Sequence, residues 1–277
     1  MKKFLFILAI AALVCTAGCA DREDGETSEA EIVGQVGTTL LVESMTVDIE
    51  SVNLTYPAYV AAPAPTGDEQ QDEGEDAGEI EKYPGIVMIH SFNGLEPGYL
   101  DLADALASAG FVVIAPEWQT FERAPMDEVV EELVRSSVDY LKGREDMNAE
   151  RLGLTGFCAG GRYTMLFLPS MEEFSSGVAW YGFPYSGGFN NETKPADLID
   201  QLDAPILIIH GTRDSPSPIS EIYQYATALD QEDKYFELKV YQGEPHGFMI
   251  EEGELSESFP AQDALDEMAR FFERTLK

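Results

Sequence analysis

The chain has 277 residues, enough for one large α/β domain or two smaller ones with a substantial apolar core. It carries 51 acidic residues against 17 lysines and arginines, which gives a formal net charge of −34. The two densest acidic stretches, 21–31 and 68–81, contain fourteen acids and one base, and without them the charge is still −21. Such a charge argues against nucleic acid and anionic lipid surfaces as partners. It also suggests a halophilic source, because dense salt screens the self-repulsion of an acidic surface.

The first nineteen residues predict export. Lys2 and Lys3 precede an apolar run from Phe4 to Val14 that is too short to cross a bilayer, and small residues lie before Cys19. The stretch 16–19 resembles a lipoprotein signal, in which cleavage leaves the cysteine to carry a diacylglyceryl group. We expect residues 1–18 to be a signal peptide, 19–31 to be a lipidated acidic tether, and the chain to be anchored at the cell surface through Cys19 alone. The alternative is free secretion, with Cys19 incidental.

Strand-length apolar runs alternate with helical patterns along the rest of the chain. Runs rich in Ile, Val and Leu that end at Gly, His or Pro are typical of strands buried on both faces. Their alternation with helices predicts an α/β fold with a mostly parallel central sheet covered by helices on both faces. The expected strands are 85–90, 111–115, 152–156, 178–182, 206–210 and 235–241, and the expected helices are 98–109, 126–141, 160–169, 218–230 and 261–276.

Two further patterns at 38–50 and 52–61 alternate apolar and polar residues, and we expect them to form an antiparallel edge of the same sheet. They are too few for a second domain, so we predict a single domain from 32 to 277. Residues 63–82 are rich in Pro, Gly, Asp, Glu and Gln, with almost nothing apolar. This composition predicts a disordered acidic loop between two strands.

Cys158 is the candidate nucleophile. Residues 156–160, Gly-Phe-Cys-Ala-Gly, place it between a predicted strand and a predicted helix. Glycines flank the strained turn of a nucleophile elbow because side chains would collide there, and the helix N-terminus stabilises a thiolate. The chain has three cysteines, so lipidation of Cys19 and removal of the signal would leave Cys158 as the sole thiol, without an internal disulfide. The alternative is a buried structural cysteine.

The chain has three histidines, and each is a candidate for the base that accepts the thiol proton. His90 and His210 end apolar strands, and we expect each to bond to neighbouring loop backbone. His246 follows the last strand, where the α/β-hydrolase fold places its catalytic histidine. Asp214 follows the strand 206–210 and would fix the imidazole tautomer, although it could instead be a turn residue. The order Cys158, Asp214, His246 is that of the α/β-hydrolase fold.

The same fold forms its oxyanion hole from two backbone amides. One belongs to the residue after the nucleophile, which is Ala159. The other comes from the loop after the strand 85–90, where Phe92 is our candidate.

Three motifs together resemble the dienelactone hydrolase family. They are Gly-Phe-Cys-Ala-Gly-Gly-Arg at 156–162, His-Gly-x-x-Asp at 210–214 and His-Gly-Phe at 246–248. The resemblance extends from about Val52 to the end of the chain. It implies a single-domain α/β-hydrolase with a Cys, His, Asp triad.

Two positions depart from that family. A glutamate that helps to gate the thiol's ionisation is replaced by Ser91, and an arginine that grips the substrate carboxylate is replaced by Ile250. Arg123 could substitute for the arginine, although it could equally be a solvated surface residue. Without the family's arginine, a substrate with a free carboxylate is not expected. Trp118 lies in a loop that we expect to border the site. The candidate substrate-binding residues are Ser91, Trp118 and Arg123.

These residues predict hydrolysis of a small ester or lactone through a thioester acyl-enzyme. No metal or organic cofactor is implied, because the histidines are few and unclustered and no phosphate-binding glycine loop follows the first strand. Two alternatives stay open. One is a surface-anchored binding module on a hydrolase scaffold, and the other is a peptidase or acyltransferase with the same triad.

Overall fold

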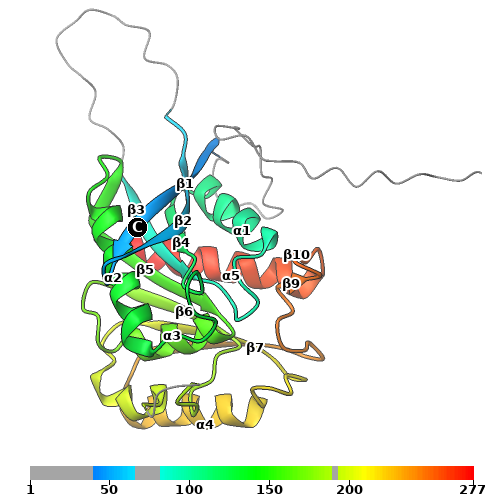
Figure 1. Cartoon of the computed structure of the whole chain (residues 1–277). Helices are drawn as coiled ribbons and strands as arrows, with labels where there is room; N and C mark the ends of the chain where they lie inside the picture. Colours follow the sequence, from blue (N-terminus) through cyan, green and yellow to red (C-terminus); the bar gives the residue numbers. More distant parts are fainter. Residues whose placement is uncertain (1–39, 66–81, 189–192) are drawn as a thin grey trace, which may run out of the picture.

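A computed structural model describes residues 40–65, 82–188 and 193–277. Its centre is an eight-stranded sheet in the order β1-β2-β4-β3-β5-β6-β7-β8 (Figure 1). β2 pairs antiparallel with both β1 and β4, and the other pairings are parallel. The predicted mostly parallel sheet with an antiparallel edge is thereby confirmed. The strands are β1 (Val42–Ser51), β2 (Leu54–Pro63), β3 (Tyr83–Ile89), β4 (Val112–Pro116), β5 (Met147–Phe157), β6 (Ser176–Trp180), β7 (Ile206–Gly211) and β8 (Phe236–Tyr241).

Helices cover both faces of this sheet (Figure 1). One face packs against α1 and α5, and the other packs against α2, α3 and α4. A 3-10 helix and a small hairpin complete the described chain. The helices are α1 (Pro97–Ser108), α2 (Asp127–Lys142), α3 (Ala159–Phe167), η1 (Pro195–Gln201), α4 (Ile219–Gln231) and α5 (Phe259–Leu276), and the hairpin strands are β9 (Ile250–Glu251) and β10 (Glu254–Leu255).

The central strand β3 shows why its sequence is apolar throughout. Ile86 and Met88 point to the side covered by α1 and α5, whereas Val87 and Ile89 point to the side covered by α2, α3 and α4. All four are fully buried. Successive strand residues face opposite sides, so a strand covered on both faces needs an unbroken apolar run.

Most observed boundaries differ from the expected ones by a few residues, and the differences at β5, β6 and β2 are the most informative. β5 begins at Met147, five residues early, because its first residues are polar and resemble a loop. β6 ends at Trp180 instead of Gly182, because Tyr181 has φ 36° and leaves the extended region. Pro63 belongs to β2, not to the acidic loop. Most of that loop and the predicted signal, anchor and tether lie outside the described residues.

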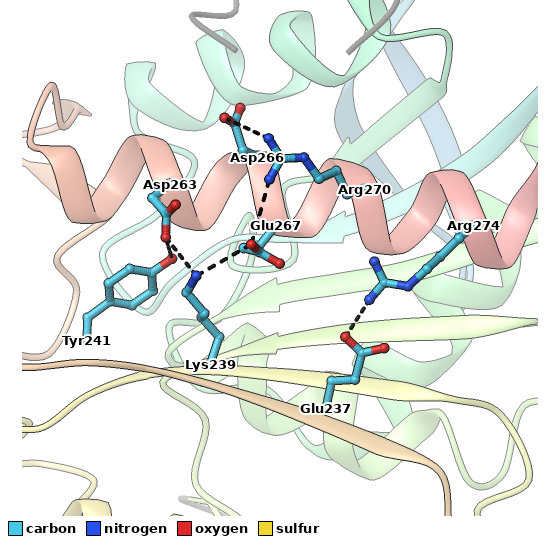
Figure 2. A network of polar contacts seen from close by, with 8 residues as sticks. All are labelled: Glu237, Lys239, Tyr241, Asp263, Asp266, Glu267, Arg270 and Arg274. Carbon is cyan, nitrogen blue, oxygen red and sulfur yellow. Dashed lines mark hydrogen bonds and ion pairs between the residues drawn. The ribbon is translucent and has the colours of Figure 1, made fainter. Parts of the chain in front are cut away.

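The edge strand β8 is joined to α5 by a network of polar side chains (Figure 2). Lys239 lies 2.8 Å from the carboxylate of Asp263 and 3.4 Å from that of Glu267. The hydroxyl of Tyr241 donates to Asp263 at 2.8 Å. A lysine on an edge strand also hinders the pairing of this edge with a second sheet. The remaining members are Glu237, Asp266, Arg270 and Arg274.

Every helix in the described ranges is either too short or too polar to span a bilayer.

Candidate active site

Cys158 lies at the turn between β5 and α3, at the carboxyl edge of the parallel strands. Its backbone has φ 57° and ψ −110°, a conformation that a non-glycine residue keeps only where the surrounding structure holds it. Its amide donates to the carbonyl of Trp180 at 3.1 Å, and its carbonyl accepts from the amide of Arg162 at 3.0 Å. The partly exposed thiol therefore sits at a fixed point beside the first N–H groups of a helix, which have no intrahelical partner.

The glycines of the motif let three backbone segments meet beneath the thiol. A Cβ on Gly160 would lie 2.0 Å from the carbonyl oxygen of Ile89, at the end of β3. A Cβ on Gly156 would lie 2.2 Å from the carbonyl oxygen of Gly160. The turn can thus pack against β3 only if both positions lack side chains.

His246 is held by Asp214. Nδ1 of the imidazole lies 2.7 Å from Oδ2 of the carboxylate, which is itself buried. The other carboxylate oxygen of Asp214 accepts the amide of Ser217 at 2.7 Å. Both oxygens are therefore used, and the carboxylate cannot turn away from the ring.

The pKa of His246 reflects this setting. Burial lowers it, but the Asp214 carboxylate and the neighbouring sulfur of Cys158 raise it by more, to about 9. Nε2 of the ring is buried and makes no hydrogen bond within the described part of the chain. It is consequently the ring atom that can exchange a proton with the thiol or with a bound molecule.

The other two histidines bond to loop carbonyls, as expected from the sequence. Nδ1 of His90 lies 2.8 Å from the carbonyl oxygen of Ser91, and Nε2 of His210 lies 2.8 Å from that of Ser217. Burial lowers the pKa of His90 to about 4 and also lowers the pKa of His210. Both rings are therefore neutral near pH 7. Nε2 of His210 also lies 3.4 Å from Oδ2 of Asp214.

A pocket of about 380 Å³ opens over Cys158 and His246. Most of its wall is aromatic or apolar, and two backbone-donor candidates, Phe92 and Ala159, also line it. The lining residues are Phe92, Trp118, Ala124, Pro125, Asp127, Cys158, Ala159, Arg162, Tyr163, Phe183, Ser186, Gly188, Pro216 and His246.

The predicted substrate-binding residues occupy different places. Trp118 lines the pocket, and its indole N–H donates to the carbonyl of His90 at 3.2 Å. Ser91 is buried, and its hydroxyl accepts the amide of Asn93 at 3.1 Å, but it is not among the lining residues. Arg123 is exposed, and its guanidinium lies 4.9 Å from the ring centre of Phe92, outside the pocket wall.

An ion pair in the pocket wall was not expected from the sequence. Arg162 and Asp127 are both buried and form two hydrogen bonds with each other, 2.9 Å and 2.7 Å long. Arg162 stands four residues after Cys158, at the end of the motif Gly-Phe-Cys-Ala-Gly-Gly-Arg. Nothing in the sequence, however, marks Asp127 as its partner 35 residues away.

Among the residues that the structure describes, no cluster of three or more His, Cys, Asp or Glu side chains could hold a metal ion.

A family model described as the dienelactone hydrolase family matches residues 74–276. A candidate carboxymethylenebutenolidase of Escherichia coli (strain K12) is 26% identical over 243 residues, which cover 82% of this chain and 85% of the relative. A candidate 2-oxo-3-(5-oxofuran-2-ylidene)propanoate lactonase of Bradyrhizobium sp. is 28% identical over 219 residues, 73% of this chain and 82% of the relative.

Solved structures share the fold. A candidate dienelactone hydrolase from Klebsiella pneumoniae superposes with a TM-score of 0.72 at 24% identity, over 84% of this chain and 99% of that one. An acylaminoacyl peptidase from Pyrococcus horikoshii superposes with a TM-score of 0.67 at 17% identity, over 85% of this chain and 42% of that one.

Proposed function

The chain belongs to the dienelactone hydrolase family, and from this premise we propose that it hydrolyses carboxylic esters or lactones with Cys158 as nucleophile, His246 as base and Asp214 as its orienting carboxylate. The observation that carries the proposal is the convergence at one pocket. Cys158 and His246 both line it, and Asp214 holds the far side of the imidazole at 2.7 Å. This is the arrangement that nucleophilic catalysis requires.

In the first half of the reaction, the Cys158 thiolate attacks the substrate carbonyl carbon. The amides of Ala159 and Phe92 donate to the oxygen that becomes negative. The tetrahedral intermediate collapses as protonated His246 gives its proton to the leaving alkoxide. The products of this half are an alcohol and a thioester on Cys158; for a lactone both remain one molecule.

In the second half, His246 removes a proton from water, which attacks the thioester carbonyl. Collapse of the second intermediate expels the Cys158 thiolate, releases the carboxylic acid and leaves His246 protonated. Asp214 stabilises the imidazolium in both halves.

The test is hydrolysis of 4-nitrophenyl acetate and butyrate by the chain lacking residues 1–19, in low and in molar salt. We expect turnover that is abolished in Cys158→Ala. A burst of one nitrophenolate per chain would support a thioester intermediate. If the folded protein turns over neither ester at any salt concentration, the hydrolase proposal is wrong and the binding module becomes the better hypothesis.

A peptidase activity is the second candidate, because the Pyrococcus horikoshii peptidase shares the fold. An aminoacyl 4-nitroanilide distinguishes the two. Cleavage of the anilide at a rate comparable with that of the matched ester would favour the peptidase.

We further propose that the chain is exported and anchored through Cys19, as the sequence of residues 2–19 suggests. Cys19 lies outside the described residues. Partition of the full chain into a detergent phase, lost in Cys19→Ala, would support a lipid anchor. Recovery of the unaltered chain in the aqueous phase would favour free secretion.

A further inference from the structure

The wall of the pocket contains a neutralised cation. Arg162 and Asp127 are buried, with side chains 5% and 11% exposed, so water screens their charges little. Nη1 and Nη2 of Arg162 donate one hydrogen bond to each carboxylate oxygen, at 2.9 Å and 2.7 Å. This two-point geometry is the one by which arginine best holds a carboxylate.

The rest of the guanidinium is also engaged. Nε donates to the carbonyl of Ser186 at 2.8 Å, and Nη2 donates a second bond to the carbonyl of Thr193 at 3.1 Å. Four of the five N–H groups are therefore in use. Gly188 lies against the guanidinium so closely that a Cβ there would be 3.2 Å from Cζ. Arg162 cannot turn toward a bound molecule without breaking several of these contacts.

Arg162 and Asp127 neutralise each other, and the other described groups around the pocket add no net charge. Among the described residues that line the pocket, the charged or ionisable groups outside the ion pair are Cys158, His246 and Tyr163, and the first two take part in the proposed reaction. Arg123 is exposed, lies over the ring of Phe92 and is not among the lining residues. The described part of the wall that receives the substrate thus has no net charge.

A substrate carboxylate in this pocket would meet two obstacles. It would compete with Asp127 for the same N–H groups, and it would be buried beside the negative charge of Asp127. Burial of a second anion without its own cation is costly, and like charges in a dry pocket repel. An uncharged acyl group meets only the apolar and aromatic wall.

We propose that Asp127 sets the substrate class: by neutralising Arg162 it restricts the enzyme to esters or lactones with an uncharged acyl group. Its removal would convert the wall into a carboxylate-binding site. This inference rests on the proposed hydrolase function.

The test compares three acyl groups of equal chain length as 4-nitrophenyl esters: valerate, glutaramate and glutarate. The last two have nearly the same shape and differ by one negative charge. Measurements in molar salt remove the long-range repulsion between glutarate and the acidic protein. Wild type is compared with Asp127→Asn, with Asp127→Ser and with the double variant Asp127→Asn/Arg162→Met. Circular dichroism and the melting temperature establish that each variant is folded.

For wild type we expect kcat/KM to be at least about tenfold higher for glutaramate than for glutarate. In Asp127→Asn and Asp127→Ser this preference should shift toward glutarate by at least about tenfold, mainly through a lower KM, because an unpaired arginine now meets the anion. The double variant lacks both charges and should again prefer glutaramate.

A wild type that cleaves glutarate as well as glutaramate overturns the inference without any variant. So do folded single variants in which all three esters lose activity together, since that is what a purely structural ion pair would cause. If wild type does not cleave valerate, or Cys158→Ala cleaves it equally, the hydrolase proposal fails instead. Stabilisation of the wild type against heat by glutaramide but not by glutarate would then still support the exclusion of carboxylates by Asp127, and equal stabilisation would overturn it.

Discussion

Nδ1 of His246 and Oδ2 of Asp214 lie 2.7 Å apart, although 32 residues separate them in the chain. The loops after β7 and β8 bring them together, because parallel neighbouring strands end at the same edge of a sheet. This bond engages Nδ1 of the imidazole and leaves Nε2 available for proton transfer. The carboxylate also raises the pKa of the ring, against the effect of burial.

Asp214→Asn should therefore lower kcat by about a thousandfold or more, because an amide nitrogen in place of the carboxylate favours the wrong tautomer and no longer stabilises the imidazolium. The pKa of His246 should fall, so the alkaline limb of the profile of kcat/KM against pH should move to lower pH. Asp230→Asn makes the same change at an exposed position of α4 and should leave both quantities unaltered. An Asp214→Asn enzyme with the activity of Asp230→Asn would exclude Asp214 from the triad.

The raised pKa of His246 also predicts how stability depends on pH. The folded state holds this proton up to about pH 9, whereas an unfolded histidine releases it near pH 6.5. The contribution of His246 to the free energy of unfolding is thus complete below pH 6.5 and is lost as the pH rises to about 9. Urea unfolding at several pH values should show a decline in wild type that is absent in His246→Gln. Parallel curves for the two proteins would contradict the raised pKa.

Gly160→Ala should destabilise the protein by more than about 3 kcal/mol, because the new Cβ would lie 2.0 Å from a backbone oxygen that cannot move aside. Gly143→Ala at the end of α2 is the matched control. There the nearest atom would be 3.4 Å away, and φ is an ordinary −78°. Urea unfolding should give an unchanged or slightly higher stability for the control. Equal stability of the two variants would refute the close packing of the turn on β3.

Lys239 should matter more at low salt than at high salt. Lys239→Met removes the cation between Asp263 and Glu267, and at low salt this should cost about 1 kcal/mol, or about 2–4 °C in Tm. Molar salt should reduce the deficit and should also raise the Tm of wild type, because it screens the net charge of −34. Lys142→Met at an exposed position of α2 controls for the loss of one charge. A wild-type Tm that does not rise with salt would contradict the predicted halophilic character.

The sequence predicted those features that depend on a local pattern of residues or on a residue type that occurs only a few times in the chain. Strands buried on both faces are continuous apolar runs, so their order and positions could be recognised. With only three histidines in the chain, the choice of His246 followed from its place after the last strand. The order of sulfur, carboxylate and imidazole along the chain then indicated the fold, and the three motifs that contain these residues indicated the family.

Features that depend on packing between distant segments could not be predicted. Asp127 begins a helix, where an acidic residue is expected in any case, and its bond to Arg162 arises only when α2 and α3 are packed side by side. The end of β6 was missed for a similar reason. Tyr181 is a good strand former, but it leaves the extended region where the chain turns beside the site.

Leu40, the first residue that the structure describes, lies at the opposite end of the sheet's strands from the pocket. Its amide donates to the carbonyl of Ser108 at 2.9 Å, and its side chain, Tyr83 and Lys277 all surround Gly110, just before β4. This is the amino edge of the parallel strands, whereas Cys158 lies at their carboxyl edge. The residues that precede Leu40 therefore join the domain at the edge opposite the one that holds Cys158. A fusion partner or surface linkage attached through that N-terminal segment would leave the mouth of the pocket unobstructed at the point of attachment.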